Sequence, residues 1–285
     1  MSPTSIIGFD SAWTDHPKKP GAVCAIRIDA EGHRSFIEPQ LASFEQALSF
    51  IEQEWSLSAR CLVALDQPTI VPNMTGMRPV DRIAASFISW LGGGVQPANR
   101  SKMGMFDDAA PIWHFKDRLG ATEDPELARN AERGTFLIEV FPALALPSLE
   151  PAFCGRLHSP RYNPERRTFR LTDWHAVTAA LVRLARDEQI VGMEDWALAA
   201  HALTTPRKPD QDRLDATICA LVGYFWLFGD PEHTMMLGDL QNGYMITPVS
   251  IAARTAPGHV VWCGSLIVLC FPANGLSDGV RRSMG

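Results

Sequence analysis

Ile-Ile-Gly-Phe-Asp at residues 6–10 and Cys-Leu-Val-Ala-Leu-Asp at residues 61–66 are two apolar runs, and each of them ends in an aspartate. Runs of this length with so few polar residues predict strands that are buried within a sheet. Asp10 and Asp66 therefore stand where a buried strand emerges, so their carboxylates are held rigidly and can still reach solvent. This placement predicts a site at one edge of the sheet.

Three further acidic residues extend this pattern. Glu139 lies inside the apolar run of residues 136–141, and Asp212 and Asp215 open a helical stretch. Carboxylates that converge on one spot repel one another unless a cation lies between them. Mg²⁺ and Mn²⁺ prefer oxygen ligands, so Asp and Glu suffice without His or Cys. The candidate metal ligands are Asp10, Asp66, Glu139, Asp212 and Asp215.

The composition indicates an ordinary globular chain. Its 285 residues suffice for one large domain or two small ones, and 46% of them are apolar, which allows a sizeable core. The formal net charge of -6 argues against a protein that coats nucleic acid by bulk charge, although a local basic groove is compatible with it.

The cysteines and the N-terminus predict a cytoplasmic protein. None of the six cysteines forms a CxxC pair, which speaks against a zinc ribbon or a thioredoxin-like site and favours a reducing compartment. The first residues lack the basic and apolar regions of a signal peptide. The longest apolar stretch, residues 260–273, is too short to span a bilayer, so we expect no membrane partner.

Hydrophobic patterning predicts a mixed α/β sheet. The first three strands form an antiparallel meander, because a turn signal separates the second from the third. A helix follows, with Ser43 as its N-cap and Gln46 placed for a capping box. The fourth strand is almost wholly apolar and is therefore central and parallel. The expected strands are residues 5–10, 21–29, 33–38, 62–66 and 135–140.

Helices complete the pattern. A large insertion after the fourth strand begins with a long irregular stretch. A helix then starts at Asp81 and stops at Gly92-Gly93-Gly94, and residues 95–133 are loop and short helix. The late helices have apolar residues at helical spacing. The remaining expected elements are a helix at residues 172–187 capped by Thr172, a helix at residues 193–203, a linker at residues 206–211, a last helix at residues 212–228 and a hairpin at residues 235–247.

Short motifs recur along residues 5–248. They are Gly8-Phe9-Asp10, Leu65-Asp66-Gln67-Pro68, Gly76-Met77-Arg78-Pro79-Val80-Asp81, Glu139-Val140-Phe141-Pro142, Arg161-Tyr162-Asn163-Pro164 and Asp215-Ala216. With the order of the strands, they resemble a bacterial and archaeal family of unknown function, domain of unknown function 429, whose members are described as predicted nucleases. The resemblance implies a ribonuclease H-like fold, with a mixed five-stranded sheet flanked by helices, over residues 1–248. Residues 249–285 form a tail to which we assign no function.

The resemblance also implies a metal-dependent nuclease or phosphodiesterase with nucleic acid as its substrate. In such enzymes two Mg²⁺ or Mn²⁺ ions, about 3.5–4 Å apart, clamp a phosphodiester during in-line attack by water. Asp10, Asp66 and Asp215 occupy the catalytic positions of this resemblance. The helix spacing agrees with it, because Asp212 and Asp215 lie three residues apart at the edge of an apolar stripe.

Some of these residues have a structural alternative. Asp212 could cap the last helix instead of binding metal. Glu139 could pair with Arg78, because a charge inside an apolar strand needs a partner. Arg78 could order its loop with Asp81, or contact phosphate through its planar guanidinium.

A basic loop is the best candidate for contacts to phosphate. Residues 156–170 contain five arginines against one acid, Glu165, and arginines of this kind position a nucleic-acid backbone. A solvated surface loop is the alternative. The candidate substrate-binding residues are Arg78, Arg161, Arg166 and Arg167.

Two other classes of function fit the same fold. ATP-binding sugar kinases share this sheet but need glycine-rich phosphate loops in two duplicated halves. Here Gly92-Gly93-Gly94 follows a predicted helix rather than a strand, and no second half is visible. A non-catalytic module that binds nucleic acid or a protein partner is compatible with the acidic net charge. A metal-dependent nuclease is the main prediction.

Overall fold

The main sheet of this chain is mixed. The computed structural model describes residues 1–251, 253, 261–263 and 266–268. Within these residues the main sheet has the strand order β5-β4-β1-β2-β3-β6. Its strands are β1 (Thr4–Asp10), β2 (Gly21–Ile28), β3 (Arg34–Ala42), β4 (Arg60–Asp66), β5 (Gly134–Glu139) and β6 (Ile190–Val191).

The topology is ribonuclease H-like. β1, β2 and β3 form an antiparallel meander, whereas β4 runs parallel to β1 and β5 runs parallel to β4, as the sequence predicts. The prediction of five strands was one strand short, because β6 adds a parallel edge beside β3. β6 has two residues, too few for a periodic pattern, so it had no sequence signal.

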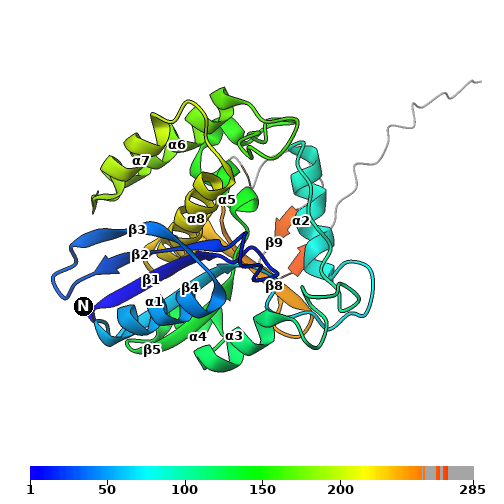
Figure 1. Cartoon of the computed structure of the whole chain (residues 1–285), viewed down its shortest axis with the longest axis horizontal. Helices are drawn as coiled ribbons and strands as arrows, with labels where there is room; N and C mark the ends of the chain where they lie inside the picture. The colour runs from blue at the N-terminus through cyan, green and yellow to red at the C-terminus, as the bar shows by residue number, and fades with distance from the viewer. Residues whose placement is uncertain (252, 254–260, 264–265, 269–285) are drawn as a thin grey trace, which may run out of the picture.

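Helices cover both faces of the sheet (Figure 1). α1 (Phe44–Ser56) and α3 (Pro111–Leu119) pack on one face around a cluster of buried apolar side chains. α6 (Leu171–Asp187) and α8 (Lys208–Phe228) lie on the opposite face. The other helices are α2 (Pro79–Trp90), α4 (Pro125–Asn130), α5 (Pro142–Leu149) and α7 (Met193–His201), with 3₁₀ turns at Pro151–Phe153 and Pro231–His233.

α8 is the central helix of the fold. It packs on β1, β2 and β4 and is buried along nearly its whole length. The crossing is so close that a Cβ on Gly8 would lie 1.9 Å from the carbonyl oxygen of Ala216. A residue without a side chain is needed for such an approach. Gly8 therefore sets how near α8 comes to β1.

The predicted start of the last helix was wrong. α8 begins at Lys208 rather than at Asp212, so residues 208–211 are helical and not a linker. The Asp210 carboxylate accepts a hydrogen bond of 2.8 Å from the backbone N–H of Arg207, which helps to begin the helix at this point. Asp212 lies inside the helix and does not cap it.

Two other helix starts also differ from the prediction. α6 begins at Leu171 after the N-cap residue Arg170, so Thr172 is inside the helix and is not its cap. α2 begins at Pro79 rather than at Asp81. Proline suits the first helical position because its φ is already helical and its missing N–H would have no partner there.

Two short motifs predicted from the sequence are confirmed. The hydroxyl of Ser43 accepts from the N–H of Gln46 at 3.3 Å, and the N–H of Ser43 donates to the Gln46 side chain at 2.9 Å. β7 (Thr234–Asp239) and β8 (Gly243–Pro248) form the expected antiparallel hairpin. Both motifs depend on neighbours in sequence, which is why the sequence could predict them.

The division of the chain at residue 248 stays a prediction. Beyond it, β9 (Val261–Cys263) pairs antiparallel with β10 (Leu266–Val268). Much of the apolar stretch at residues 260–273 lies outside the described residues. Among the helices of the described part, none combines the length and the apolar character needed to cross a membrane.

A methyl group at Gly8 should destabilise the protein. Gly8→Ala places Cβ against the Ala216 carbonyl and pushes α8 away from β1, so the free energy of unfolding should fall by about 1–3 kcal/mol. Urea unfolding followed by circular dichroism measures this loss. Gly94→Ala is the matched control, because no atom lies within 4 Å of a Cβ at Gly94. Equal stability of the two variants would contradict the assigned role of Gly8.

Candidate functional site

The register of β1 and β4 brings Asp10 and Asp66 together. The strands are parallel, and Asp10 is the direct partner of Asp66. Residues level with each other on neighbouring strands point to the same face, and successive residues alternate between faces. Gly8 and Ala64 face α8. Asp10 and Asp66, two residues farther along each strand, therefore face α8 as well.

α8 adds Asp212 and Asp215 to the same edge, and both are buried. Asp215 Oδ1 accepts a hydrogen bond from the Tyr162 hydroxyl at 2.7 Å, and Asp215 Oδ2 accepts one from Gln211 Nε2 at 2.5 Å. Gln211 Oε1 is buried and has no hydrogen-bond partner among the described residues. Two hydrogen bonds thus hold the Asp215 carboxylate in place, and the neighbouring Gln211 has an unused hydrogen-bond acceptor. We call Asp10, Asp66, Asp212 and Asp215 the acid centre.

Lys208, in the first turn of α8, brings a positive charge to the acid centre. Its ammonium donates a hydrogen bond to Asp212 Oδ1. Burial lowers the pKa of Lys208, but the charges of Asp10 and Asp212 outweigh burial and hold this pKa above its usual value. Sequence analysis missed Lys208 because it placed residues 206–211 in a linker. On a helix, its spacing of four residues from Asp212 would have been the signal.

The carboxylates of the acid centre are poorly compensated. Burial raises the pKa of Asp10 and of Asp66 well above the usual value, and neighbouring carboxylates raise both further. Burial also raises the pKa of Asp215 to about 6, although Lys208 and two hydrogen bonds oppose this rise. An added positive charge would lower all of these values. The acid centre therefore favours a bound cation.

Glu139 is engaged in an ion pair, although its charge raises the pKa of Asp66 and both residues line a cavity of about 240 Å³. It is level with Leu65, so it points to the opposite face of the sheet from Asp66. Arg78 Nη2 lies 2.6 Å from Glu139 Oε1 and 2.8 Å from the carboxylate of Asp81. Arg78 has no exposed surface and is not available to a phosphate. For both Glu139 and Arg78, the structure shows the structural alternative, a buried ion pair.

The arginine-rich loop is adjacent to the acid centre. Arg161 and Arg166 line a cavity of about 290 Å³ that also contains Asp215, which we call the Asp215 cavity. Arg167 is exposed and is not among the residues that line it. Tyr162, in the same loop, is buried and donates a hydrogen bond to Asp215. Two of the three predicted arginines of this loop therefore reach the site.

A second cavity opens on the other side of the acid centre. It has a volume of about 500 Å³, and Asp10, Asp212 and Lys208 line it. Lys18 and Lys19 lie on its wall. We call it the Asp10 cavity. The acid centre is therefore accessible from two sides, and each side has basic residues on its wall.

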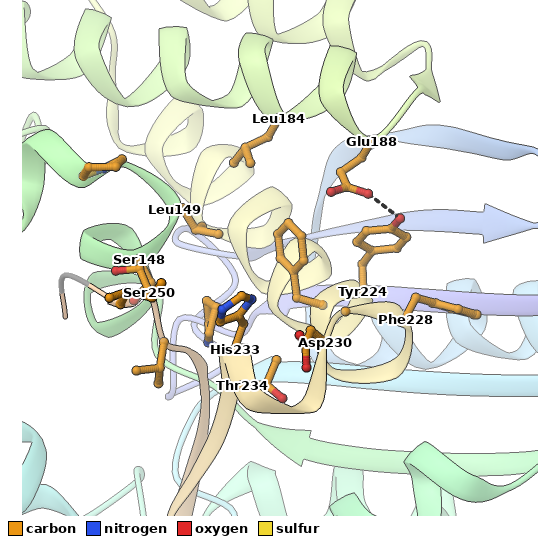
Figure 2. Close-up of a pocket in the computed structure, with 16 residues that line it drawn as sticks. Ser148, Leu149, Leu184, Glu188, Tyr224, Phe228, Asp230, His233, Thr234 and Ser250 are labelled. Atoms are coloured by element: carbon orange, nitrogen blue, oxygen red, sulfur yellow. Dashed lines mark hydrogen bonds between the residues drawn. The ribbon is translucent and has the colours of Figure 1, made fainter. Parts of the chain in front are cut away.

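A larger cavity lies away from the acid centre (Figure 2). Its volume is about 560 Å³, and it lies at the C-terminal end of α8 beside Tyr224 and Phe228. The Tyr224 hydroxyl donates to Glu188 across this cavity at 2.7 Å. The acids of α8 are in its N-terminal half, so this cavity is not part of the acid centre.

The donor set fits a divalent cation held by pairs of carboxylates. Among the described residues, just one group of three possible ligands has all its ligand atoms within 4.8 Å of one another, and it is Asp29, Glu31 and His33 on an exposed turn. The acid centre therefore does not form a closed cage. Mg²⁺ usually keeps several waters and binds through one or two carboxylates, so a pair such as Asp66 and Asp215 suffices.

Comparison with known proteins places the chain in a family. A family profile described as "Protein of unknown function (DUF429)" matches residues 8–236. The chain belongs to the DUF429 family. This match contains the whole acid centre and confirms the resemblance predicted from the motifs. Searches of curated proteins and of solved structures returned no match. Membership of the DUF429 family assigns no activity to the chain.

Loss of the Arg78 guanidinium should strongly destabilise this DUF429 protein. Arg78→Met leaves the Glu139 and Asp81 carboxylates buried without a cation, and breaking a buried ion pair in this way costs about 3–5 kcal/mol. Urea unfolding measures the change. Arg166→Met removes an exposed arginine and should alter stability by less than about 0.5 kcal/mol. If the two variants lose the same stability, the buried ion pair is not important.

The raised pKa of Asp215 predicts a pH-dependent stability in metal-free protein. The folded state holds a proton on Asp215 up to about pH 6, whereas the usual Asp pKa is 3.8. The wild type therefore loses stability relative to Asp215→Asn as the pH rises from about 4 to about 6, by about 3 kcal/mol. Urea unfolding of both proteins in EDTA across this range measures the difference. A difference that stays constant with pH would contradict the prediction.

Proposed function

We propose that this DUF429 protein is a divalent-metal-dependent phosphodiesterase that hydrolyses nucleic acid. The observation that carries the proposal is the convergence of four carboxylates, Asp10, Asp66, Asp212 and Asp215, at one edge of the sheet. Charged groups this well buried are costly unless they are paired or bind metal. Lys208 compensates one of the four charges, which leaves a strong preference for a further cation.

Each residue of the acid centre has a role in this proposal. When bound, Mg²⁺ or Mn²⁺ would make a coordinated water more acidic and would neutralise charge on a phosphate. Asp66 and Asp215 are the residues that would hold the metal, and Asp10, the direct strand partner of Asp66, would add its charge beside them. Tyr162 orients Asp215, so that its carboxylate is positioned before metal or substrate binds.

The cavity walls favour a polyanionic substrate. Arg161 and Arg166 line the Asp215 cavity, and Lys18 and Lys19 line the Asp10 cavity. A phosphodiester chain that passes from one cavity to the other would cross the acid centre with basic residues at both ends. Trp13 also lines the Asp10 cavity, and its indole N–H donates to the Asp66 carbonyl at 3.0 Å. Such a fixed aromatic ring suits a base of single-stranded nucleic acid.

A non-catalytic module that binds nucleic acid is the second candidate. One observation favours it: in the described part of the chain, the acid centre does not bring three ligand atoms within 4.8 Å of one another. The basic residues on the cavity walls would serve this function as well. The two candidates differ in one respect, because a binding module does not cleave the nucleic acid that it binds.

We also propose that the protein functions in the cytoplasm. Cys24, Cys61, Cys154 and Cys219 are free thiols in the structure. Free thiols are typical of a reducing compartment. The proposal therefore keeps the location that the sequence predicts.

The test is cleavage of single-stranded DNA and RNA by the purified full chain with Mn²⁺. The wild type should cleave at least one of them, and Asp215→Asn should lower the rate at least about 100-fold, because metal catalysis contributes several kcal/mol. Glu38→Gln, which removes an exposed acid on β3, should cleave at the wild-type rate. Circular dichroism checks that all three proteins are folded.

Two outcomes would reject this function. Equal cleavage by the wild type and by Asp215→Asn would assign the activity to a contaminant. Retention of both nucleic acids without cleavage would support the binding module instead.

A further inference from the structure

The two sides of the acid centre differ in the charge that they already contain. On the side of the Asp10 cavity, Lys208 donates a hydrogen bond to Asp212 and lies near Asp10. The Asp215 cavity is lined by Asp66 and Asp215, and its lining residues include no ammonium group. The Lys208 ammonium is thus in direct contact with one side of the acid centre, whereas it acts on Asp66 and Asp215 only through space.

The arginines of the Asp215 cavity do not remove this asymmetry. Arg161 and Arg166 line that cavity, yet among the described residues neither of them forms an ion pair with Asp66 or Asp215. Asp215 instead accepts hydrogen bonds from two uncharged groups. The Asp66 and Asp215 carboxylates therefore lack a direct cationic partner.

Lys208 stands where a second metal ion would bind. Its ammonium donates a hydrogen bond to Asp212, and it lines the Asp10 cavity together with Asp10 and Asp212. A divalent cation between these two carboxylates would have to displace the ammonium or meet its repulsion at short range. The Asp10 side of the centre thus already contains its cation.

The side chain of Gln211 indicates that a ligand binds on the side of the Asp215 cavity. Gln211 is 7% exposed, and its Oε1 is buried without a partner in the described part of the chain. Its Nε2 donates a hydrogen bond to Asp215, and Gln211 lines the Asp215 cavity together with that residue. An amide oxygen accepts hydrogen bonds from metal-bound water and can also bind a hard cation itself.

We infer that the acid centre binds one divalent cation, on the side of Asp66, Asp215 and Gln211, and that Lys208 takes the place of a second ion. The inference rests on the proposed function and replaces the two ions that the sequence analysis predicts. Lys208 is a positioning residue, because it acts through the carboxylates of Asp10 and Asp212. The acid centre then binds one metal ion, and the Lys208 ammonium provides its second cation.

The experiment counts the Mn²⁺ ions bound by each full-length protein. Protein freed of metal with EDTA is dialysed to equilibrium against Mn²⁺, and bound metal per chain is measured by atomic absorption. The wild type should bind one ion. Lys208→Met removes the ammonium and keeps the length of the side chain, so it should bind two ions. Lys208→Arg keeps the positive charge and should bind one.

Two carboxylate variants test the same asymmetry without changing Lys208. Asp212→Asn should still bind one ion, because Asp212 accepts a hydrogen bond from the Lys208 ammonium and is not a ligand of the metal. Asp215→Asn should lose the ion, because Asp215 is a ligand of the metal in this inference. Lys18→Met is the matched control, since it removes a positive charge from the wall of the Asp10 cavity and should leave one ion bound. These variants decide the matter even if Lys208→Met does not fold.

Each remaining outcome counts against a stated claim. Two ions in the wild type, or one ion in a folded Lys208→Met, would overturn the inference while the proposed metal-dependent function stands. Loss of the ion in Asp212→Asn would also overturn it. A wild type that binds no Mn²⁺ would reject the proposed function together with the inference.

Discussion

The close contact between α8 and β1 at Gly8 is the constraint on which the acid centre depends. Because Gly8 has no side chain, the backbone of α8 lies against the strand at Ala216. Asp215 is the residue before Ala216, and Asp10 lies two residues beyond Gly8. The same contact that packs the core therefore brings the helix acids to the strand acids. Stability and site geometry have one origin in this fold.

The protein contains two buried groups of charged side chains, and they differ in how their charges are compensated. Around Arg78, the carboxylates of Glu139 and Asp81 lie 2.6 and 2.8 Å from one guanidinium, so each charge has a partner. In the acid centre, Lys208 compensates one side, and the pKa values of Asp10 and Asp66 are raised by burial and by mutual repulsion. Buried charges that are paired contribute structure, whereas uncompensated ones that face cavities are candidates for function.

The two sides of the acid centre have different roles in the proposed reaction. One cavity has Lys208 beside Asp10 and Asp212, and the other is lined by Asp215 and by Gln211, whose Oε1 is unused. If one cation binds on the second side, the first side still offers a positive charge to a substrate phosphate. Unlike a bound metal ion, the Lys208 side chain cannot dissociate together with the product. A one-ion centre of this kind would depend less on the concentration of free metal than a two-ion centre.

The sequence by itself determined the meander and the parallel strands and proposed Asp10, Asp66, Asp212 and Asp215 as site residues, because these follow from local apolar runs and helical spacing. It could not separate Glu139 from them. That distinction required the register of β5 on β4, since a shift of one residue moves a side chain to the opposite face. Lys208, Gln211 and Tyr162 became visible as partners of the acids in the tertiary structure alone, because their roles depend on contacts between segments that lie far apart or on a helix start that local pattern did not reveal.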